Sequence, residues 1–135
     1  MSVMQVEVVS NEYNIYSGEA SFAVVPTVQG ELGIYPRHEP IMSLVRPGAL
    51  RLQIPGEKEE VLVAVSGGVL EVQPDKLTVL ADVAVRSSEM DQARAEEAKK
   101  AAEAGIAKAT DDEALAKAHS ALAAALAELK TLDYI

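Results

Sequence analysis

Ser87-Ser88-Glu89-Met90-Asp91 is the stretch at which the residue composition of the chain changes. All six prolines and every glycine but one precede it, whereas alanine dominates the residues that follow. Proline and glycine favour turns, and alanine has the highest helix propensity. Ser88 with Asp91 three residues later is a candidate capping box, which marks a helix start. The pattern predicts a β domain over residues 1–86 and a helical domain over residues 87–135.

The composition excludes several classes of protein. The formal net charge is −9 over 135 residues and both predicted domains are acidic, which argues against a nucleic-acid binder. The absence of cysteine excludes disulfides and thiolate metal sites, and two histidines are too few for a histidine-rich metal site. No signal peptide or apolar run near the roughly 20 residues of a membrane span is present. We therefore expect an intracellular protein without a metal cofactor.

Alternating apolar and polar residues predict short strands before residues 87–91, which we call the hinge stretch. The predicted strands cover residues 4–8, 13–17, 20–26, 49–54, 60–65, 69–73 and 76–81. The predicted turns cover residues 11–12, 17–18, 45–48, 55–58 and 74–75, and the paired glycines within residues 66–68 predict a positive φ or a bulge. Regularly spaced short strands with close turns predict one closed antiparallel sandwich or barrel.

The segment from Gly30 to Pro40, GELGIYPRHEP, is rich in glycine and proline. It lacks the lysine and hydroxyl ending of a phosphate loop, and no long helix pattern follows it. We interpret it as a structural turn. His38 has no serine or cysteine partner in a recognisable arrangement, so a hydrogen-bonded structural role is favoured over that of a general base.

Two helices are predicted after the hinge stretch. Residues 90–109 contain one helix breaker, Gly105, and small residues recur there at spacings of three and four. Thr110 to Glu113 supplies a second capping box, so a second helix is predicted to start there. Leucine and alanine follow at heptad positions in that helix. These are Leu115, Ala118, Leu122, Ala125, Leu129 and Leu132, with Leu126 beside them.

The two apolar stripes predict an antiparallel helical hairpin with a weak seam. Alanine facing leucine buries little apolar area, and each Å² contributes only about 25 cal/mol. A hairpin that undocks without unfolding its helices is one interpretation. A permanently docked helical appendage is the other, and the composition leaves both open.

Three segments together resemble the epsilon-subunit family of F-type ATP synthases. They are residues 30–36 with His38 and Pro40, residues 66–72 (SGGVLEV) and residues 90–95 (MDQARA). The resemblance covers nearly the whole chain. It implies an antiparallel β-sandwich of about ten strands followed by an antiparallel two-helix hairpin.

The resemblance also implies a function. The expected protein is a non-catalytic subunit of the rotating central stalk, peripheral on the cytoplasmic face of the bacterial cell membrane. The expected partners are the gamma subunit, the membrane ring of c subunits and, when the helices extend, the catalytic alpha/beta head. Rotation of the ring would be coupled to ATP synthesis through the sandwich, and the helices would restrain ATP hydrolysis. Glu31 is the candidate contact with the ring, and His38 is a second candidate ring or stalk contact.

Some relatives bind ATP through a motif of the form Ile/Leu-Asp-x-x-Arg-Ala; here Asp91, Arg94 and Ala95 match it, while Met90 replaces the first aliphatic residue. By this resemblance, Arg94 would meet phosphate. The second helix, however, carries Ala124 and Glu128 where such relatives present arginines, and Glu128 would repel a triphosphate.

Lys117 is then the remaining basic candidate on the second helix. Two interpretations stay open: ATP as a regulatory ligand, and a purely structural role for Asp91 and Arg94 at a helix start. A free-standing nucleotide-responsive binding module is accordingly the alternative function. An enzyme is disfavoured, because the chain lacks a nucleophile with a base, a catalytic carboxylate pair and a metal cluster.

Overall fold

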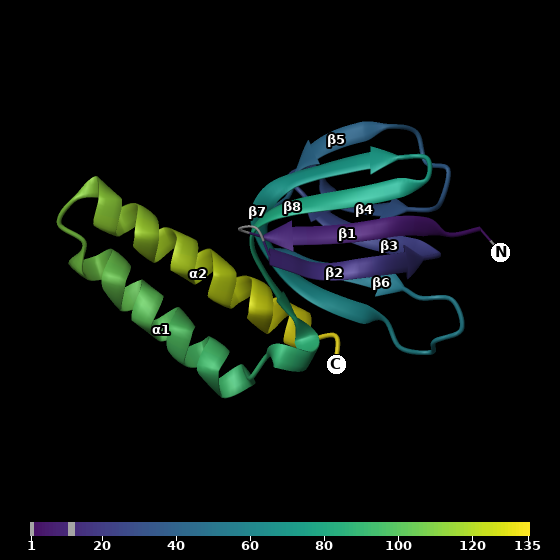
Figure 1. Cartoon of the computed structure of the whole chain (residues 1–135). Helices are drawn as coiled ribbons and strands as arrows, with labels where there is room; N and C mark the ends of the chain where they lie inside the picture. Colours follow the sequence, from purple (N-terminus) through teal and green to yellow (C-terminus); the bar gives the residue numbers. More distant parts are fainter. Residues whose placement is uncertain (1, 11–12) are drawn as a thin grey trace.

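The computed structural model describes residues 2–10 and 13–135, so the turn predicted at residues 11–12 lies outside the described residues. Eight strands precede two α-helices in this part of the chain (Figure 1). The strands are β1 (Met4–Ser10), β2 (Tyr13–Ala20), β3 (Phe22–Thr27), β4 (Gly30–Ile34), β5 (Ile41–Leu44), β6 (Gly48–Gln53), β7 (Val61–Gln73) and β8 (Lys76–Arg86). A short 3₁₀ turn, η1 (Ser87–Glu89), leads to α1 (Gln92–Lys108) and α2 (Asp112–Leu132).

The strands form a two-layer sandwich because β7 and β8 each take part in both layers. The first half of β7 pairs with β6, and its second half pairs with β5. One layer therefore has the order β2-β1-β8-β7-β5, and the other has the order β8-β7-β6-β3-β4. Counting the two long strands once in each layer turns eight continuous strands into the ten strand segments implied by the resemblance.

Inward-facing residues of the two layers fill the core between them. Every second residue of β1 is buried, as the alternation predicted. The largest fully buried side chains are Met4, Ile34, Leu50, Leu52, Leu70, Leu77, Val6, Val8, Val25, Val63, Val65 and Val72. A sandwich with such a shared apolar core behaves as one mechanical unit.

Two glycines allow β7 to cross between the layers. Gly67 and Gly68 have φ values of +68° and +117°, as expected for paired glycines at this position. A side chain at Gly68 would collide with the backbone carbonyl of Leu80 on the neighbouring strand β8. The positive φ predicted for the paired glycines of residues 66–68 is therefore confirmed, and the strands predicted on either side of them are one long strand, β7.

Four sequence predictions in the β domain need correction. Residues 30–34 form strand β4, because the turn is made by Val28 and Gln29, Gly30 leaves it with a positive φ, and Leu32 and Ile34 then face the core. Strand β2 runs through the turn predicted at residues 17–18. Strand β5 was not predicted at all. Finally, β1 pairs in parallel with β8, so the sandwich is antiparallel except at this one pair among the described strands.

Both helices begin one to three residues later than their capping boxes indicated. Asp91, not Ser88, caps α1, and its Oδ1 accepts a hydrogen bond from the Arg94 backbone N–H at 3.2 Å. Asp111, not Thr110, caps α2 by accepting from the Ala114 N–H at 2.8 Å. In both places an aspartate stands inside the predicted box, and its carboxylate is as good a cap as a hydroxyl while adding a charge that favours the helix dipole.

The helices form the predicted antiparallel hairpin, and its seam is shallow. Ala95, Ala102 and Ala125 are buried, whereas the leucines of α2 are half-buried. A methyl group at Gly105 would lie 3.3 Å from the Ala118 Cβ, so the two helices approach closely near the hairpin tip. Within the described part of the chain, neither helix combines the length and the hydropathy of a membrane span.

The C-terminal end of α2 meets the sandwich, while the hairpin tip points away from it (Figure 1). Ala125 and Ala127 lie roughly 200° apart around the helix, so they are buried on opposite sides. Ala118 and Ala125 belong to the side that faces α1, which places Ala127 and the fully buried Thr131 against strands β6 and β7. We call α1 and α2 together the helical arm.

Candidate functional site

Glu31 lies on the outer face of the β6-containing layer. Its partner in the β3–β4 register is Pro26, whose side chain also points outward, and the Glu31 side chain is exposed. The arm docks on the same outer face, two strands away, where Ala49 of β6 is paired with Ala64 of β7. The predicted ring contact and the docked end of the arm therefore share one face of the sandwich.

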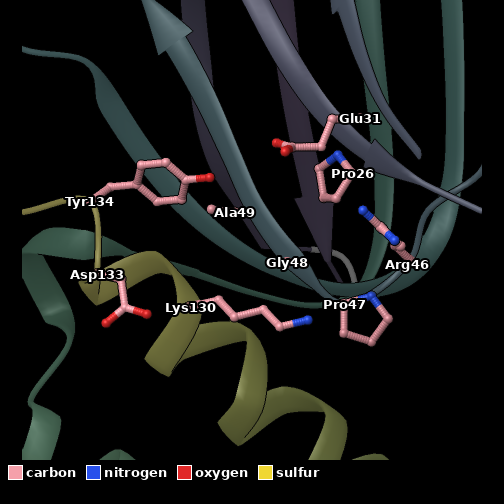
Figure 2. A pocket seen from close by; sticks show the side chains of 9 residues that line it. All are labelled: Pro26, Glu31, Arg46, Pro47, Gly48, Ala49, Lys130, Asp133 and Tyr134. Carbon is pink, nitrogen blue, oxygen red and sulfur yellow. The ribbon is translucent and has the colours of Figure 1, made fainter.

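A cavity of about 220 Å³ separates Glu31 from the end of α2 (Figure 2). The strands and their loops contribute Pro26, Glu31, Arg46, Pro47, Gly48 and Ala49, and the arm contributes Lys130, Asp133 and Tyr134. The Glu31 carboxylate and the Tyr134 hydroxyl both point into this cavity (Figure 2). Two cations and two carboxylates balance one another in the lining, so the cavity offers no strong field of either sign.

His38 lies in a different environment. Its Nδ1 is 2.8 Å from the Glu39 carbonyl oxygen, so Nδ1 carries the proton and donates. The neighbouring Arg37 has a φ of +67°, and its N–H donates to the Pro74 carbonyl. His38 does not line the Glu31 cavity. A local hydrogen bond that orients the loop agrees with the structural role favoured from the sequence.

Asp91 and Arg94 lie at the open end of the hairpin, next to the sandwich. They line a cavity of about 310 Å³ together with Val85, Glu89, Ala98 and Glu128. The Arg94 side chain is exposed, whereas Ala95 is buried in the hairpin and does not line the cavity. Asp91 and Arg94, two of the three motif residues, therefore line the same cavity.

Lys117 does not join this cavity. It lines a groove at the tip of the hairpin. Eleven residues separate it from Glu128, which corresponds to about 16 Å along the helix. The cavity beside Arg94 thus contains one guanidinium and three carboxylates, those of Glu89, Asp91 and Glu128.

The protonation of Glu128 in this cavity depends more on its burial than on its attraction to Arg94. Burial raises the pKa of Glu128, and the nearby positive charge of Arg94 offsets part of that rise. An attraction smaller than the desolvation cost is typical of a charge pair that is not in close contact. Within residues 2–10 and 13–135, no group of three or more histidine and acidic side chains is arranged to hold a metal ion.

A row of apolar side chains crosses the outer face of the other layer. Leu44 of β5 is the register neighbour of Val69 on β7, which neighbours Leu80 on β8, which neighbours Val9 on β1. Leu44 and Leu80 are 59% and 51% exposed. Exposed contiguous apolar side chains are typical of a protein interface.

Sequence reasoning missed this apolar row because β5 was not predicted. No clear signal was present in the sequence, because residues 41–44 (Ile-Met-Ser-Leu) do not alternate between apolar and polar side chains. Ile41 packs against the core, whereas Met42 and Leu44 face outward. The row itself depends on which strands are neighbours, and a strand pattern alone does not contain that information.

The fold and these surfaces define a class of protein: a β-sandwich that presents interface residues and carries a helical arm. The family description "ATP synthase, Delta/Epsilon chain, beta-sandwich domain" matches residues 3–87. The description "ATP synthase, Delta/Epsilon chain, long alpha-helix domain" matches residues 88–133. The chain belongs to this family, the epsilon chains of ATP synthase, which are accessory and non-catalytic subunits of the complex.

Curated relatives match over nearly their whole length. The ATP synthase epsilon chain of Neisseria meningitidis serogroup C (strain FAM18) is 87% identical over 135 residues, covering 100% of this chain and 96% of the relative. The epsilon chain of Chromobacterium violaceum is 62% identical over the same shares. That of Halorhodospira halophila is 45% identical over 98% of this chain and 94% of its own length.

Solved structures share the fold at low sequence identity. A chain of the Euglena gracilis mitochondrial ATP synthase, in an assembly of OSCP, F1 and c-ring, superposes with a TM-score of 0.76 at 20% identity, covering 96% of this chain and 81% of that one. A chain of the Tetrahymena thermophila mitochondrial ATP synthase central stalk and c-ring gives a TM-score of 0.59 at 15% identity, covering 97% and 95%.

Proposed function

We propose that this chain couples rotation of the membrane ring of a bacterial proton-translocating F-type ATP synthase to ATP synthesis, and that its arm restrains ATP hydrolysis. The observation that carries the proposal is the pairing of a closed two-layer sandwich with an arm that docks by one end only. We place the boundary between the two units at residues 86 and 87, where β8 gives way to the turn η1. Peripheral attachment to the cytoplasmic face of the membrane follows from this role.

Torque transmission requires a stiff element. Strands β7 and β8 run through both layers, so the layers cannot slide past each other without breaking these two strands. Close packing of the shared core adds resistance to deformation. Both features support a mechanical role for the sandwich.

Two separate faces suit two partners. The apolar row of Leu44, Val69, Leu80 and Val9 is our candidate surface for the gamma subunit, because stable stalk assembly needs buried apolar area. Glu31, on the opposite layer, is our candidate contact with the polar loops of the c-ring. The solved structures with this fold come from assemblies that contain a c-ring.

Release of the arm is supported by the residues that bury it. Ala49, Ala64 and the larger Leu62 are buried on the face of the sandwich where α2 docks, and Ala127 and Thr131 are buried on the side of α2 that faces the strands, so small side chains form much of the contact. Each buried methyl-sized group contributes only about 0.8 kcal/mol. An arm held in this way can exchange its sandwich contacts for contacts with gamma and the alpha/beta head while its helices stay folded.

A nucleotide-responsive module is the weaker candidate. The three carboxylates beside Arg94 oppose a triphosphate, and Lys117 lies too far along the helix to compensate. We propose that Asp91 serves as the cap of α1 and that Arg94 moderates the charge of Glu128.

The proposal is tested by returning the purified chain to membranes stripped of their epsilon subunit. We expect it to sediment with the membranes and to restore ATP-driven proton pumping. A chain that neither binds these membranes nor changes pumping would contradict the stalk role. Heat-denatured chain serves as the control for nonspecific sedimentation.

A further inference from the structure

We infer that Arg51 and Tyr134 form a clasp that holds the C-terminal end of the arm on the sandwich. The guanidinium of Arg51 lies 4.7 Å from the centroid of the Tyr134 ring. Arg51 belongs to the sandwich strand β6, and Tyr134 follows the last turn of α2. The contact therefore joins the two units directly. The inference concerns the arm named in the proposed function, yet it is a property of the isolated chain.

The sandwich side of the clasp is built to present a flat cation. Arg51 points outward from β6 opposite Leu62, on the face where α2 docks. Its Nη1 forms an ion pair with Oε1 of Glu60 at 3.6 Å, which holds the guanidinium near this face. Its Nε is buried and has no hydrogen-bond partner among the described residues. A partly desolvated guanidinium stacks more strongly on an aromatic face than a fully hydrated one.

The arm side is held in place by a compact chain end. The Tyr134 N–H donates to the Thr131 carbonyl at 3.1 Å, and the Ile135 N–H donates to the Leu132 carbonyl at 3.2 Å. These bonds continue the turn of the helix past its last residue, Leu132. The fully buried Thr131, whose hydroxyl donates to the Ala127 carbonyl at 2.7 Å, anchors this turn against the strands. Tyr134 is thereby aimed at the sheet.

The clasp matters because few large side chains surround it. The other residues buried on the docking face include Leu62 and the small residues Ala49, Ala64 and Ala127, and the small side chains bury little area. The contact of the Tyr134 ring with the Arg51 guanidinium therefore adds a substantial part of the hold on the arm. Loss of the clasp is expected to raise the undocked fraction on the order of fivefold.

The test uses a thiol buried under the arm. The chain has no cysteine, so Thr131→Cys introduces a single thiol on the side of α2 that faces the sheet. Its rate of reaction with a thiol reagent measures how often the arm undocks. We expect Tyr134→Ala to raise this rate on the order of fivefold and Tyr134→Phe, which keeps the ring, to leave it nearly unchanged.

Two controls separate undocking from unfolding. Tyr13, on strand β2, is exposed and outside the clasp, so Tyr13→Ala should not change the rate. A thiol at the fully buried core position Ala23 reports global unfolding, and its rate should be the same with and without Tyr134→Ala. Arg51→Ala should raise the Thr131→Cys rate as well, and combining it with Tyr134→Ala should add little more.

An increase below twofold for Tyr134→Ala would overturn the clasp. An equal increase at the Ala23 thiol would also overturn it, since the change would then act on the whole fold. The measurement needs no other subunit. A negative result therefore counts against the clasp alone, and the stalk role keeps its own test on stripped membranes.

Discussion

Arg94 and Glu128 line one cavity at the base of the helical arm, although α1 carries the first residue and α2 the second. Burial raises the pKa of the Glu128 carboxyl more than the positive charge of Arg94 lowers it. Glu89 and Asp91 bring two further carboxylates to the same space. The charges of this cavity determine both whether ATP can bind beside Arg94 and how the stability of the arm depends on pH.

ATP is expected not to bind specifically. Isothermal titration of the chain with magnesium and ATP should give no saturable heat at millimolar ligand, because three carboxylates surround the one guanidinium. The double variant Ala124→Arg with Glu128→Arg replaces a carboxylate by two cations and should gain measurable affinity. Saturable binding by the parent chain would show that the motif residues Asp91 and Arg94 do form a nucleotide site.

Glu128→Gln is expected to stabilise the arm at neutral pH. Because the pKa of Glu128 is raised in the folded chain, the folded state binds this proton more tightly than the unfolded state. The contribution is then most favourable below the ordinary glutamate range and is lost as the pH rises through the raised pKa. The variant avoids that loss, and the gain is expected to be small because solvent screens this partly exposed site.

Thermal unfolding followed by circular dichroism measures this difference. The advantage of Glu128→Gln over the parent should shrink as the pH falls from about 7 toward about 5. Glu103→Gln, at an exposed position of α1, is the matched control and should show no such trend. A variant less stable than the parent at neutral pH would mean that attraction to Arg94 outweighs burial.

Gly68→Ala is expected to destabilise the sandwich strongly. The position combines a φ of +117° with a collision between the new methyl group and the Leu80 carbonyl. Gly30 has a similar φ of +112° but open space around it. Urea unfolding should show a loss of about 1 to 3 kcal/mol for Gly30→Ala and a clearly larger loss for Gly68→Ala. Equal losses would mean that the crossing of β7 tolerates a side chain.

Leu44→Glu is expected to abolish docking on the gamma subunit without unfolding the chain. Leu44 is exposed in the apolar row, so a charge there costs nothing in the free chain but must be desolvated in a complex. Affinity for isolated gamma, measured by titration calorimetry, should fall at least about tenfold. Tyr13→Glu, at an exposed position of β2 outside the row, is the control. Unchanged affinity for the Leu44 variant would assign gamma to another face.

Local patterns predicted much of this fold. The alternation of Met4, Val6 and Val8 identified a strand that the structure confirms, and the change of composition after Ser87 identified the helices. Errors arose where local signals compete. Glycines at positions 30 and 33 concealed strand β4, whose pairing with β3 is the feature that makes it extended.

The candidate site was less predictable. The proximity of Asp91 and Arg94 could be predicted from their spacing, since Asp91 caps the helix and Arg94 lies in its first turn. The cavity that joins Glu31 to the end of α2 depends instead on where a helix docks on a sheet. The parallel pairing of β1 with β8 is likewise a long-range arrangement that a local pattern does not encode.

ATP hydrolysis by an F-type ATPase stripped of its epsilon subunit tests the central claim most directly. The full chain and a chain ending at residue 86 are added back in parallel, after circular dichroism has confirmed that the shorter chain folds. We predict that both bind the enzyme and that only the full chain lowers hydrolysis several-fold. Equal inhibition by both chains, or no effect of the full chain, would contradict the assignment of regulation to the arm.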